Sequence, residues 1–132
     1  MEGSLLYVTD TSAFVWFLTS DKRLGKSALR IFRMADYGKE LIVIPSIVLM
    51  EMLYLCEHKG LKMALREIIN MISRAENYMV FPLNLSVIMA CMDVPLREIH
   101  DRIIVATAKI LNSPLITNDK NIIKSKIVET VW

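Results

Sequence analysis

Short runs of apolar and β-branched residues, separated by segments with helical features, constrain the fold of this chain more than any other feature. Leu5–Thr9 and Leu41–Ile44 are the clearest of these runs. Such continuous runs are typical of strands that are buried on both faces, as in a parallel sheet. Tyr78–Leu83, Leu115–Thr117 and Ile127–Val131 are further predicted strands.

The segments between these strands carry helix start signals, helix stop signals or apolar residues at helical spacing. The predicted helices are residues 11–18, 24–35, 46–58, 61–76, a helix capped by Asn84 or Ser86 and running to Met92, residues 99–111, and a short turn that Asp119 starts. The expected order is β-α-α-β-α-α-β-α-α-β-α-β, without a repeat or linker. This alternation predicts one domain, residues 1–132, with a three-layer α/β/α fold and a parallel sheet of about five strands.

The apolar content is high enough that a membrane protein must be considered, since the chain is 54% hydrophobic with a mean hydropathy of +0.40. The longest apolar stretch, Leu41–Met50, contains Pro45 and Ser46 and ends at Glu51. It falls short of the ~20 residues that a spanning helix needs. We therefore expect a soluble, unprocessed, cytoplasmic protein with no membrane segment, whose surplus apolar residues cover a sheet and form an interface with another subunit or partner.

Cysteine usage and net charge exclude little. Cys56 and Cys91 lie in apolar surroundings without CxxC or CxxH spacing, which favours reduced core residues in a cytosolic protein over zinc ligands or a disulfide framework. The net charge of +2 permits an RNA or DNA partner without requiring one.

Four carboxylates stand at unusual places in this pattern. Asp10 and Asp119 each follow a predicted strand, and ligands of parallel sheets collect at the carboxyl ends of the strands. Glu51 lies on a helix whose residues three and four positions away are all apolar or aromatic, so its charge is costly there unless it is paired or bound to a metal. Asp101 begins the helix before the fourth strand, and the sequence alone does not determine whether it reaches the same edge.

Each acid also has a simpler interpretation. Asp10, Asp101 and Asp119 can act as helix caps or as favourable charges at helix N-termini, and Glu51 can face solvent. Four such positions in one small domain nevertheless favour a shared site, and oxygen-only ligands suit Mg²⁺ or Mn²⁺. His58 and His100 do not change this expectation, although His100 directly precedes Asp101.

The motifs around these acids resemble those of the PIN-domain nucleases, and in particular the VapC-like toxin ribonucleases of toxin/antitoxin pairs. The resemblance covers essentially the whole chain. It rests on Val8–Ala13, on Pro45–Glu51, on the block His100–Ala108 and on the segment Pro114–Asp119. The last two segments are the most specific.

The resemblance implies a metal-dependent endoribonuclease that hydrolyses RNA phosphodiester bonds, with a small antitoxin as partner and a homodimer as the assembly. Asp10, Glu51, Asp101 and Asp119 match the metal-binding and catalytic acids of the family. The supporting residues are Thr11, Ser12 and Thr117, and Arg102 and Lys120 are candidates for contact with RNA. Some members carry a further acid after the fourth, and Asn121 stands near that place here, which leaves one or two metals open.

Other classes fit the residues less well. No Ser-His-Asp or Cys-His arrangement for a covalent nucleophile is visible in the sequence. A phosphoacceptor domain would need an early acidic pair, and an Asp-x-Asp phosphatase would need an acid where Ser12 stands. A PIN-like module that binds RNA or protein without cutting and a housekeeping RNA-processing nuclease remain alternatives.

Overall fold

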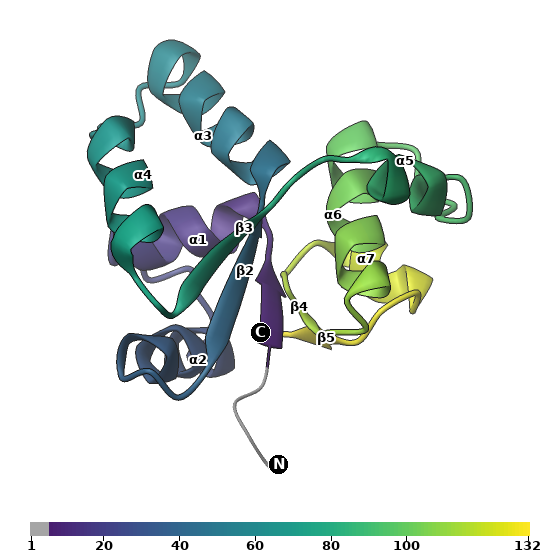
Figure 1. The fold of residues 1–132 in the computed structure, drawn as a ribbon, viewed down its shortest axis with the longest axis horizontal. Helices are drawn as coiled ribbons and strands as arrows, with labels where there is room; N and C mark the ends of the chain where they lie inside the picture. The colour runs from purple at the N-terminus through teal and green to yellow at the C-terminus, as the bar shows by residue number, and fades with distance from the viewer. Residues whose placement is uncertain (1–5) are drawn as a thin grey trace.

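The computed structural model describes residues 6–132, which form a five-stranded parallel sheet with helices on both sides (Figure 1). The strands are β1 (Leu6–Thr9), β2 (Leu41–Pro45), β3 (Tyr78–Phe81), β4 (Leu115–Ile116) and β5 (Thr130–Val131), in the spatial order β3-β2-β1-β4-β5. The predicted start of the first strand at Leu5 lies outside the described residues. Five parallel strands confirm the predicted sheet.

Seven helices connect the strands in the predicted order: α1 (Thr11–Leu18), α2 (Lys26–Asp36), α3 (Ser46–His58), α4 (Leu65–Arg74), α5 (Leu85–Cys91), α6 (Ile99–Ile110) and α7 (Lys120–Ser125). Figure 1 shows α1 to α4 on one side of the sheet and α5 to α7 on the other. The predicted α/β/α layering is therefore confirmed.

The path of the chain explains the two layers. The chain starts at the central strand β1, moves outward to β2 and β3, and then crosses back to β4 and β5 on the other side of β1. Parallel crossovers are right-handed, so connections that run in opposite directions along a sheet place their helices on opposite faces. The direction reverses between β1 and β4, and a switch point of this kind opens a crevice at the carboxyl ends of the two strands.

The core lies on both faces of the central strands. Val8, Val43 and Ile44 are fully buried on β1 and β2, and α6 packs against β1 through a continuous buried segment, residues 103–108. Residues buried on both faces of a strand give the continuous apolar runs seen in the sequence. Within residues 6–132, none of the helices has the length and apolar character needed to cross a membrane.

The element ends differ from the predictions where a neighbour limits them. β5 covers only Thr130–Val131 because its partner β4 has just two residues, Leu115 and Ile116, which pair with it. β3 stops at Phe81, the residue that pairs with the last residue of β2, and is followed by a proline that cannot donate to the ladder. α4 starts at Leu65, later than predicted, because the backbone N–H of Leu61 donates to Leu55 and ends α3 instead.

Candidate active site

All four acids singled out in the sequence line one pocket at the carboxyl edge of the sheet. Asp10 follows β1, Asp119 follows β4, Glu51 lies on α3 and Asp101 lies in the first turn of α6. The pocket is also lined by Thr11, Ser12, Trp16, Ile104 and Asn118. The structure therefore joins four segments that are far apart in the sequence, at the point where the direction of the chain reverses.

Asp10 is held by both of its carboxylate oxygens. Oδ1 accepts a hydrogen bond from the backbone N–H of Ala13 at 2.8 Å, and Asp10 is the N-cap of α1. Oδ2 accepts from the hydroxyl of Thr117 at 2.6 Å. The fully buried Thr117 hydroxyl in turn accepts from the backbone N–H of Asp119 at 3.1 Å. Thr117 thus ties the ends of β1 and β4 together beneath the pocket.

Asp119 has a similar double position. It is the N-cap of α7, where its Oδ1 accepts from the backbone N–H of Ile122 at 3.0 Å, and it also lines the pocket. The capping interpretation is therefore confirmed for Asp10 and Asp119. Because capping of this kind uses one carboxylate oxygen, it does not remove these residues from the pocket.

Asp101 is not a cap. α6 begins at Ile99 with Glu98 as its N-cap, and Glu98 Oε1 accepts from the backbone N–H of Asp101 at 2.8 Å. The capping interpretation is wrong for Asp101, because a glutamate three residues earlier supplies the cap. The other simple interpretation holds, since Asp101 is an acidic residue in the first turn of α6. α6 leads into β4 and runs antiparallel to it, so its first turn lies at the carboxyl edge of the sheet. The sequence had left this placement open.

Glu51 faces the pocket from α3 and bridges two elements. Its Oε1 accepts from the Thr11 hydroxyl at 2.5 Å, and its Oε2 lies 3.5 Å from Nδ1 of His100. The same His100 nitrogen lies 3.2 Å from Oε2 of Glu98. Glu51 is therefore not an acid on a bare apolar face, since α1 and α6 both present polar partners to it.

The pocket is electrostatically unfavourable for two of its acids. Burial raises the pKa of Asp10 to about 6, with a further rise from Asp119 and Glu51, against hydrogen bonds from Thr117 and Ala13 that lower it. Burial also raises the pKa of Asp101 to about 6, followed by repulsion from Asp119, Glu98, Glu51 and Asp10. Each charge thus disfavours its neighbours, which is typical of sites that receive a cation.

The carboxylates share the pocket without forming a ready-made chelate. Within residues 6–132, no group of three or more Asp, Glu, His or Cys side chains is placed so that it is suited to hold a metal ion as it stands. The hydrogen bonds explain the orientations, since Thr11 holds Glu51, Thr117 and Ala13 hold Asp10, and Ile122 holds Asp119. The donor set, carboxylates with threonine and serine hydroxyls, is nevertheless the chemistry that hard divalent cations prefer.

The two residues expected to contact RNA do not line this pocket. Nε of Arg102 donates to the backbone carbonyl of Cys91 at 2.8 Å, which links α6 to α5. Lys120 is exposed at the first position of α7, next to Asp119. Both roles stay predictions.

Sequence patterns missed three wall residues and one positioning residue. Trp16 and Ile104 have the spacing of core residues, and Asn118 has the appearance of an ordinary loop residue, so none carried a signal. Glu98 could have been found, because it stands three residues before Asp101 in the way that a capping side chain does. Its length, unlike that of Asp or Ser, makes it an uncommon cap.

The sequence matches one known family model, and the fold is similar to that of several solved structures. The sequence model of the PIN domain matches residues 7–127. No curated protein sequence matches the chain. Among solved structures, a chain of VapBC2 from Rickettsia felis, bound to a DNA fragment from its promoter, superposes with a TM-score of 0.69 at 15% identity and covers 96% of this chain and 98% of its own.

Two further structures are similar in fold. A chain of the DNA-bound VapBC of Salmonella typhimurium has a TM-score of 0.66 at 14% identity, covering 96% of this chain and 97% of its own. A chain of a toxin-antitoxin complex from Klebsiella pneumoniae has a TM-score of 0.63 at 18% identity, with 98% and 97% covered. At these identities the likeness shows a shared fold.

Proposed function

This chain belongs to the PIN-domain family, whose nucleases are hydrolases that act on nucleic acids, and we propose that it is a metal-dependent endoribonuclease. One observation carries the proposal. Asp10, Glu51, Asp101 and Asp119 come from four separate segments and line a single pocket at the switch point of the sheet. A core or a solvated surface gives no reason for four acids to converge there.

We propose Mg²⁺ or Mn²⁺ as the cofactor, because PIN-domain nucleases generally use divalent metal ions and the raised pKa values of Asp10 and Asp101 mark charges that a cation would relieve. Asp10, Glu51 and Asp101 would hold the principal ion, and Asp119 a second ion or a water molecule beside it. When bound, the ion would lower the pKa of the attacking water and stabilise the leaving oxygen.

The chain's own residues set the geometry for that chemistry. Thr117 orients Asp10 from beneath, and Thr11 orients Glu51 across the gap between α1 and α3. The exposed Ser12 hydroxyl, on the wall of the pocket, would donate to a phosphate oxygen of the substrate. Lys120 and Arg102, which flank two of the acids in sequence, are the proposed contacts with the RNA backbone.

The test is cleavage of a single-stranded or loop RNA by the purified chain with Mn²⁺ or Mg²⁺. Asp10→Asn and Asp101→Asn should abolish cleavage while circular dichroism and urea unfolding show a folded protein. Asp93→Asn, which changes an exposed aspartate outside the pocket, is the matched control and should cleave as the wild type does. Equal cleavage by the wild type and the two pocket variants would refute the proposal.

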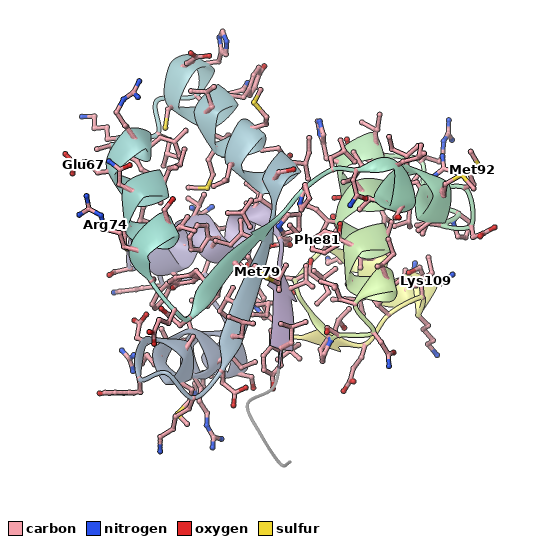
Figure 2. All side chains as sticks on the ribbon, viewed as in Figure 1. Glu67, Arg74, Met79, Phe81, Met92 and Lys109 are labelled. Atoms are coloured by element: carbon pink, nitrogen blue, oxygen red, sulfur yellow. The ribbon has the colours of Figure 1, made fainter. Side chains whose placement is uncertain are left out.

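We further propose that the chain is the toxin of a type II toxin/antitoxin pair, acts in the cytoplasm and forms a homodimer. The similar folds come from toxin/antitoxin complexes, and large apolar side chains are exposed around α5, including Leu85 (73%) and Met92 (68%). Figure 2 shows Met92 at the outer end of the α5 region, away from the sheet. Exposed apolar surface of this kind is expected where a partner binds.

Two alternatives keep the same fold. A PIN-like module that binds RNA or protein without turnover would also retain the pocket, and the cleavage assay separates it. A housekeeping RNA-processing nuclease would cleave in the same way but would have no inhibitory partner. A neighbouring reading frame for a small protein that blocks cleavage would favour the toxin.

A further inference from the structure

A second cavity adjoins the acid pocket and shares one wall with it. Trp16 of α1 lines both. The rest of the second cavity includes Lys22 from the loop after α1 and Arg33 from the last turn of α2. Among residues 6–132, the acid pocket is lined by four acids and by no basic residue, whereas the second cavity is lined by Asp21 and by the exposed Lys22 and Arg33.

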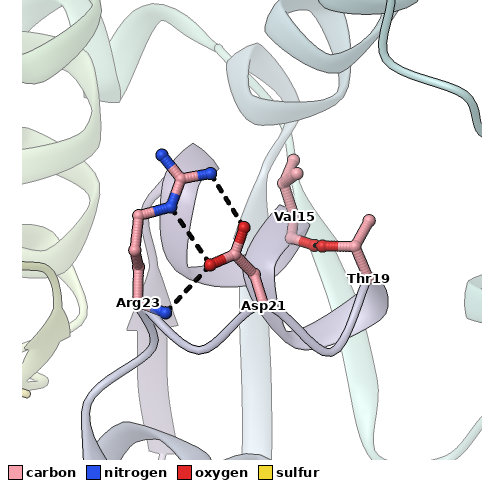
Figure 3. A network of polar contacts seen from close by, with 4 residues as sticks. All are labelled: Val15, Thr19, Asp21 and Arg23. Atoms are coloured by element: carbon pink, nitrogen blue, oxygen red, sulfur yellow. Dashed lines mark hydrogen bonds and ion pairs between the residues drawn. The ribbon is translucent and has the colours of Figure 1, made fainter.

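The loop after α1 is fastened to Trp16. The backbone N–H of Asp21 donates to the Trp16 carbonyl at 2.8 Å, and Ser20 has a positive φ of 55°, as the residue that ends a helix in the left-handed region does. The Thr19 hydroxyl donates to the carbonyl of Val15 at 2.8 Å (Figure 3). These hydrogen bonds hold the loop against the last turn of α1.

Asp21 then fixes the plane of Arg23. Nε and Nη2 of Arg23 donate to the two carboxylate oxygens at 3.0 and 2.8 Å, and the Arg23 backbone N–H donates to Oδ1 at 2.9 Å (Figure 3). The Arg23 guanidinium lowers the pKa of Asp21 to about 2, so the pair stays charged throughout the physiological range. Bidentate pairs of this kind add geometric specificity to the attraction.

The fixed guanidinium lies over an aromatic ring. Cζ of Arg23 is 4.5 Å from the centroid of the Trp16 ring. The Trp132 ring packs against the Trp16 ring in an edge-to-face arrangement, at a centroid distance of 5.8 Å. The Arg23 side chain is still 68% exposed. Within residues 6–132, Nη1 of Arg23 donates to no protein acceptor. The Arg23 guanidinium is thus a flat cationic group next to a wall of the acid pocket, with one face and the Nη1 donor open.

From these observations we propose that Arg23, stacked on Trp16 and braced by Asp21, forms a subsite that binds one nucleotide of a single-stranded RNA substrate, with Lys22 and Arg33 contacting its phosphates. The proposal rests on RNA being the substrate of the acid pocket. Guanidinium and aromatic planes stack on the π-face of any base, and lysine and arginine neutralise the backbone. Trp16 lies six residues after Asp10, about 9 Å along α1 at ~1.5 Å per residue. Because Trp16 itself also lines the acid pocket, a nucleotide bound at this subsite would be a near neighbour of the one at the acids.

An RNA strand fits this surface better than a protein partner does. The open groups are a planar π-face, one guanidinium donor and two exposed cations, whereas the large exposed apolar side chains around α5 lie elsewhere. A partner protein that binds through apolar contacts would therefore bind around α5 rather than at Arg23.

The test measures binding separately from cleavage. The full chain is titrated in EDTA against a fluorescent ten-nucleotide single-stranded RNA, and Kd is read from anisotropy. Arg23→Gln should weaken binding about tenfold, and Lys22→Gln should lower the salt slope of log Kd by about one unit. Arg74→Gln and Lys109→Gln are matched controls and should bind as the wild type does, because both side chains point outward from α4 and α6 in Figure 2 and neither lines the two cavities.

A charge-preserving variant separates stacking from simple attraction. Arg23→Lys keeps the charge but loses the plane, so it should bind the RNA about fivefold more weakly than the wild type and bind an abasic strand equally well. Unchanged binding by Arg23→Gln, or wild-type binding of the base-bearing RNA by Arg23→Lys, would overturn the subsite. If the wild type does not cleave RNA with Mn²⁺ but Arg23→Gln still weakens RNA binding, the subsite stands and the nuclease is refuted. If Arg23→Gln cleaves and binds RNA as the wild type does, the nuclease stands and the subsite is refuted.

Discussion

Replacing Asp10 by asparagine should make the metal-free protein more stable at neutral pH, although it should destroy the activity. The Asp10 carboxyl has a pKa raised from 3.8 to about 6 in the folded chain. Between these values the folded state binds more protons than the unfolded state, so the free energy of unfolding falls as pH rises. A difference of about 2.2 pKa units at ~1.36 kcal/mol each corresponds to a loss of about 3 kcal/mol above pH 6.

Asparagine removes this titration and keeps the cap. Its side-chain oxygen can still accept from the backbone N–H of Ala13, which Asp10 does now at 2.8 Å. Its NH₂ group faces the Thr117 hydroxyl, which now donates to Asp10, so one hydrogen bond must rearrange at a cost of about 1 kcal/mol. That cost is the same at every pH, so the change in the difference between variant and wild type from pH 4 to pH 7.5 should be about 2.4 kcal/mol. It is smaller than the full 3 kcal/mol because the Asp10 carboxyl of the unfolded chain is already partly ionised at pH 4.

The assay is urea unfolding in EDTA, followed by the fluorescence of the two tryptophans, at pH 4.0, 5.0, 6.0 and 7.5. Relative to the wild type, Asp10→Asn should gain stability steadily across this range, whereas the surface control Asp93→Asn should not. Saturating Mn²⁺ at pH 7.5 should stabilise the wild type by about 2 to 3 kcal/mol at a hundred times Kd and stabilise the variant less. A difference between Asp10→Asn and wild type that stays constant from pH 4 to pH 7.5 would refute the account of Asp10 as a buried, penalised charge.

Three further changes probe other contacts. Thr117→Val should lower the free energy of unfolding by about 1 to 3 kcal/mol and weaken Mn²⁺ binding measured by calorimetry. The reason is that it leaves Asp10 and the Asp119 N–H without their shared partner. Thr117→Ser keeps the hydroxyl and should recover most of the stability and of the Mn²⁺ binding. Gly25→Ala should cost about 1 to 3 kcal/mol in urea unfolding, because a Cβ there collides with the backbone carbonyl of Trp132. Ser27→Ala, at an exposed site in the first turn of α2, the helix that follows Gly25, should be nearly neutral. Leu85→Gln with Met92→Gln should lower the dimer fraction in light scattering, since both exposed side chains become polar; Tyr37→Ser, an exposed aromatic at the end of α2, should leave it unchanged.

The element order could be predicted because each element carries its own local signal. Buried runs marked the central strands, and Asn84 and Asp119 marked two helix starts, where both now accept from the backbone three residues on. The limits of β3 and β5 could not be predicted, because a strand ends where its partner ends, and pairing partners are not adjacent in sequence. The same holds for the crossing from β3 to β4, which determines where the pocket opens.

The site residues, like the elements, could be predicted only where a local signal marks them. Acids that follow strands gave Asp10 and Asp119, but the arrival of Asp101 at the same edge depends on the direction of α6, which only the three-dimensional path determines. The stack of Arg23 on Trp16 could not be predicted either. The basic residues after the first helix, Lys22, Arg23 and Lys26, are candidates for contact with a phosphate backbone from the sequence, but Trp16 has the spacing of a core residue and gives no sign that Arg23 packs on it. The hydrogen bond from the Asp21 backbone N–H to the Trp16 carbonyl brings the two residues together, and no pattern in the sequence predicts it.

The sequence offers helix capping and site formation as two separate interpretations of Asp10, and in the structure Asp10 does both. A helix that starts at the carboxyl end of a strand needs an acceptor for its first N–H groups, and the pocket opens at that same junction. One aspartate oxygen serves the helix while the carboxylate charge serves the pocket. Asp10→Asn removes the charge and rearranges the hydrogen bond with Thr117 but keeps the cap. Asp10→Ala removes the cap as well, so this variant should be less stable than Asp10→Asn by about 0.5 to 2 kcal/mol, the usual contribution of an N-cap. Equal stability of the two would show that the hydrogen bond to Ala13 contributes nothing to α1, and that Asp10 lies at this junction for the pocket alone.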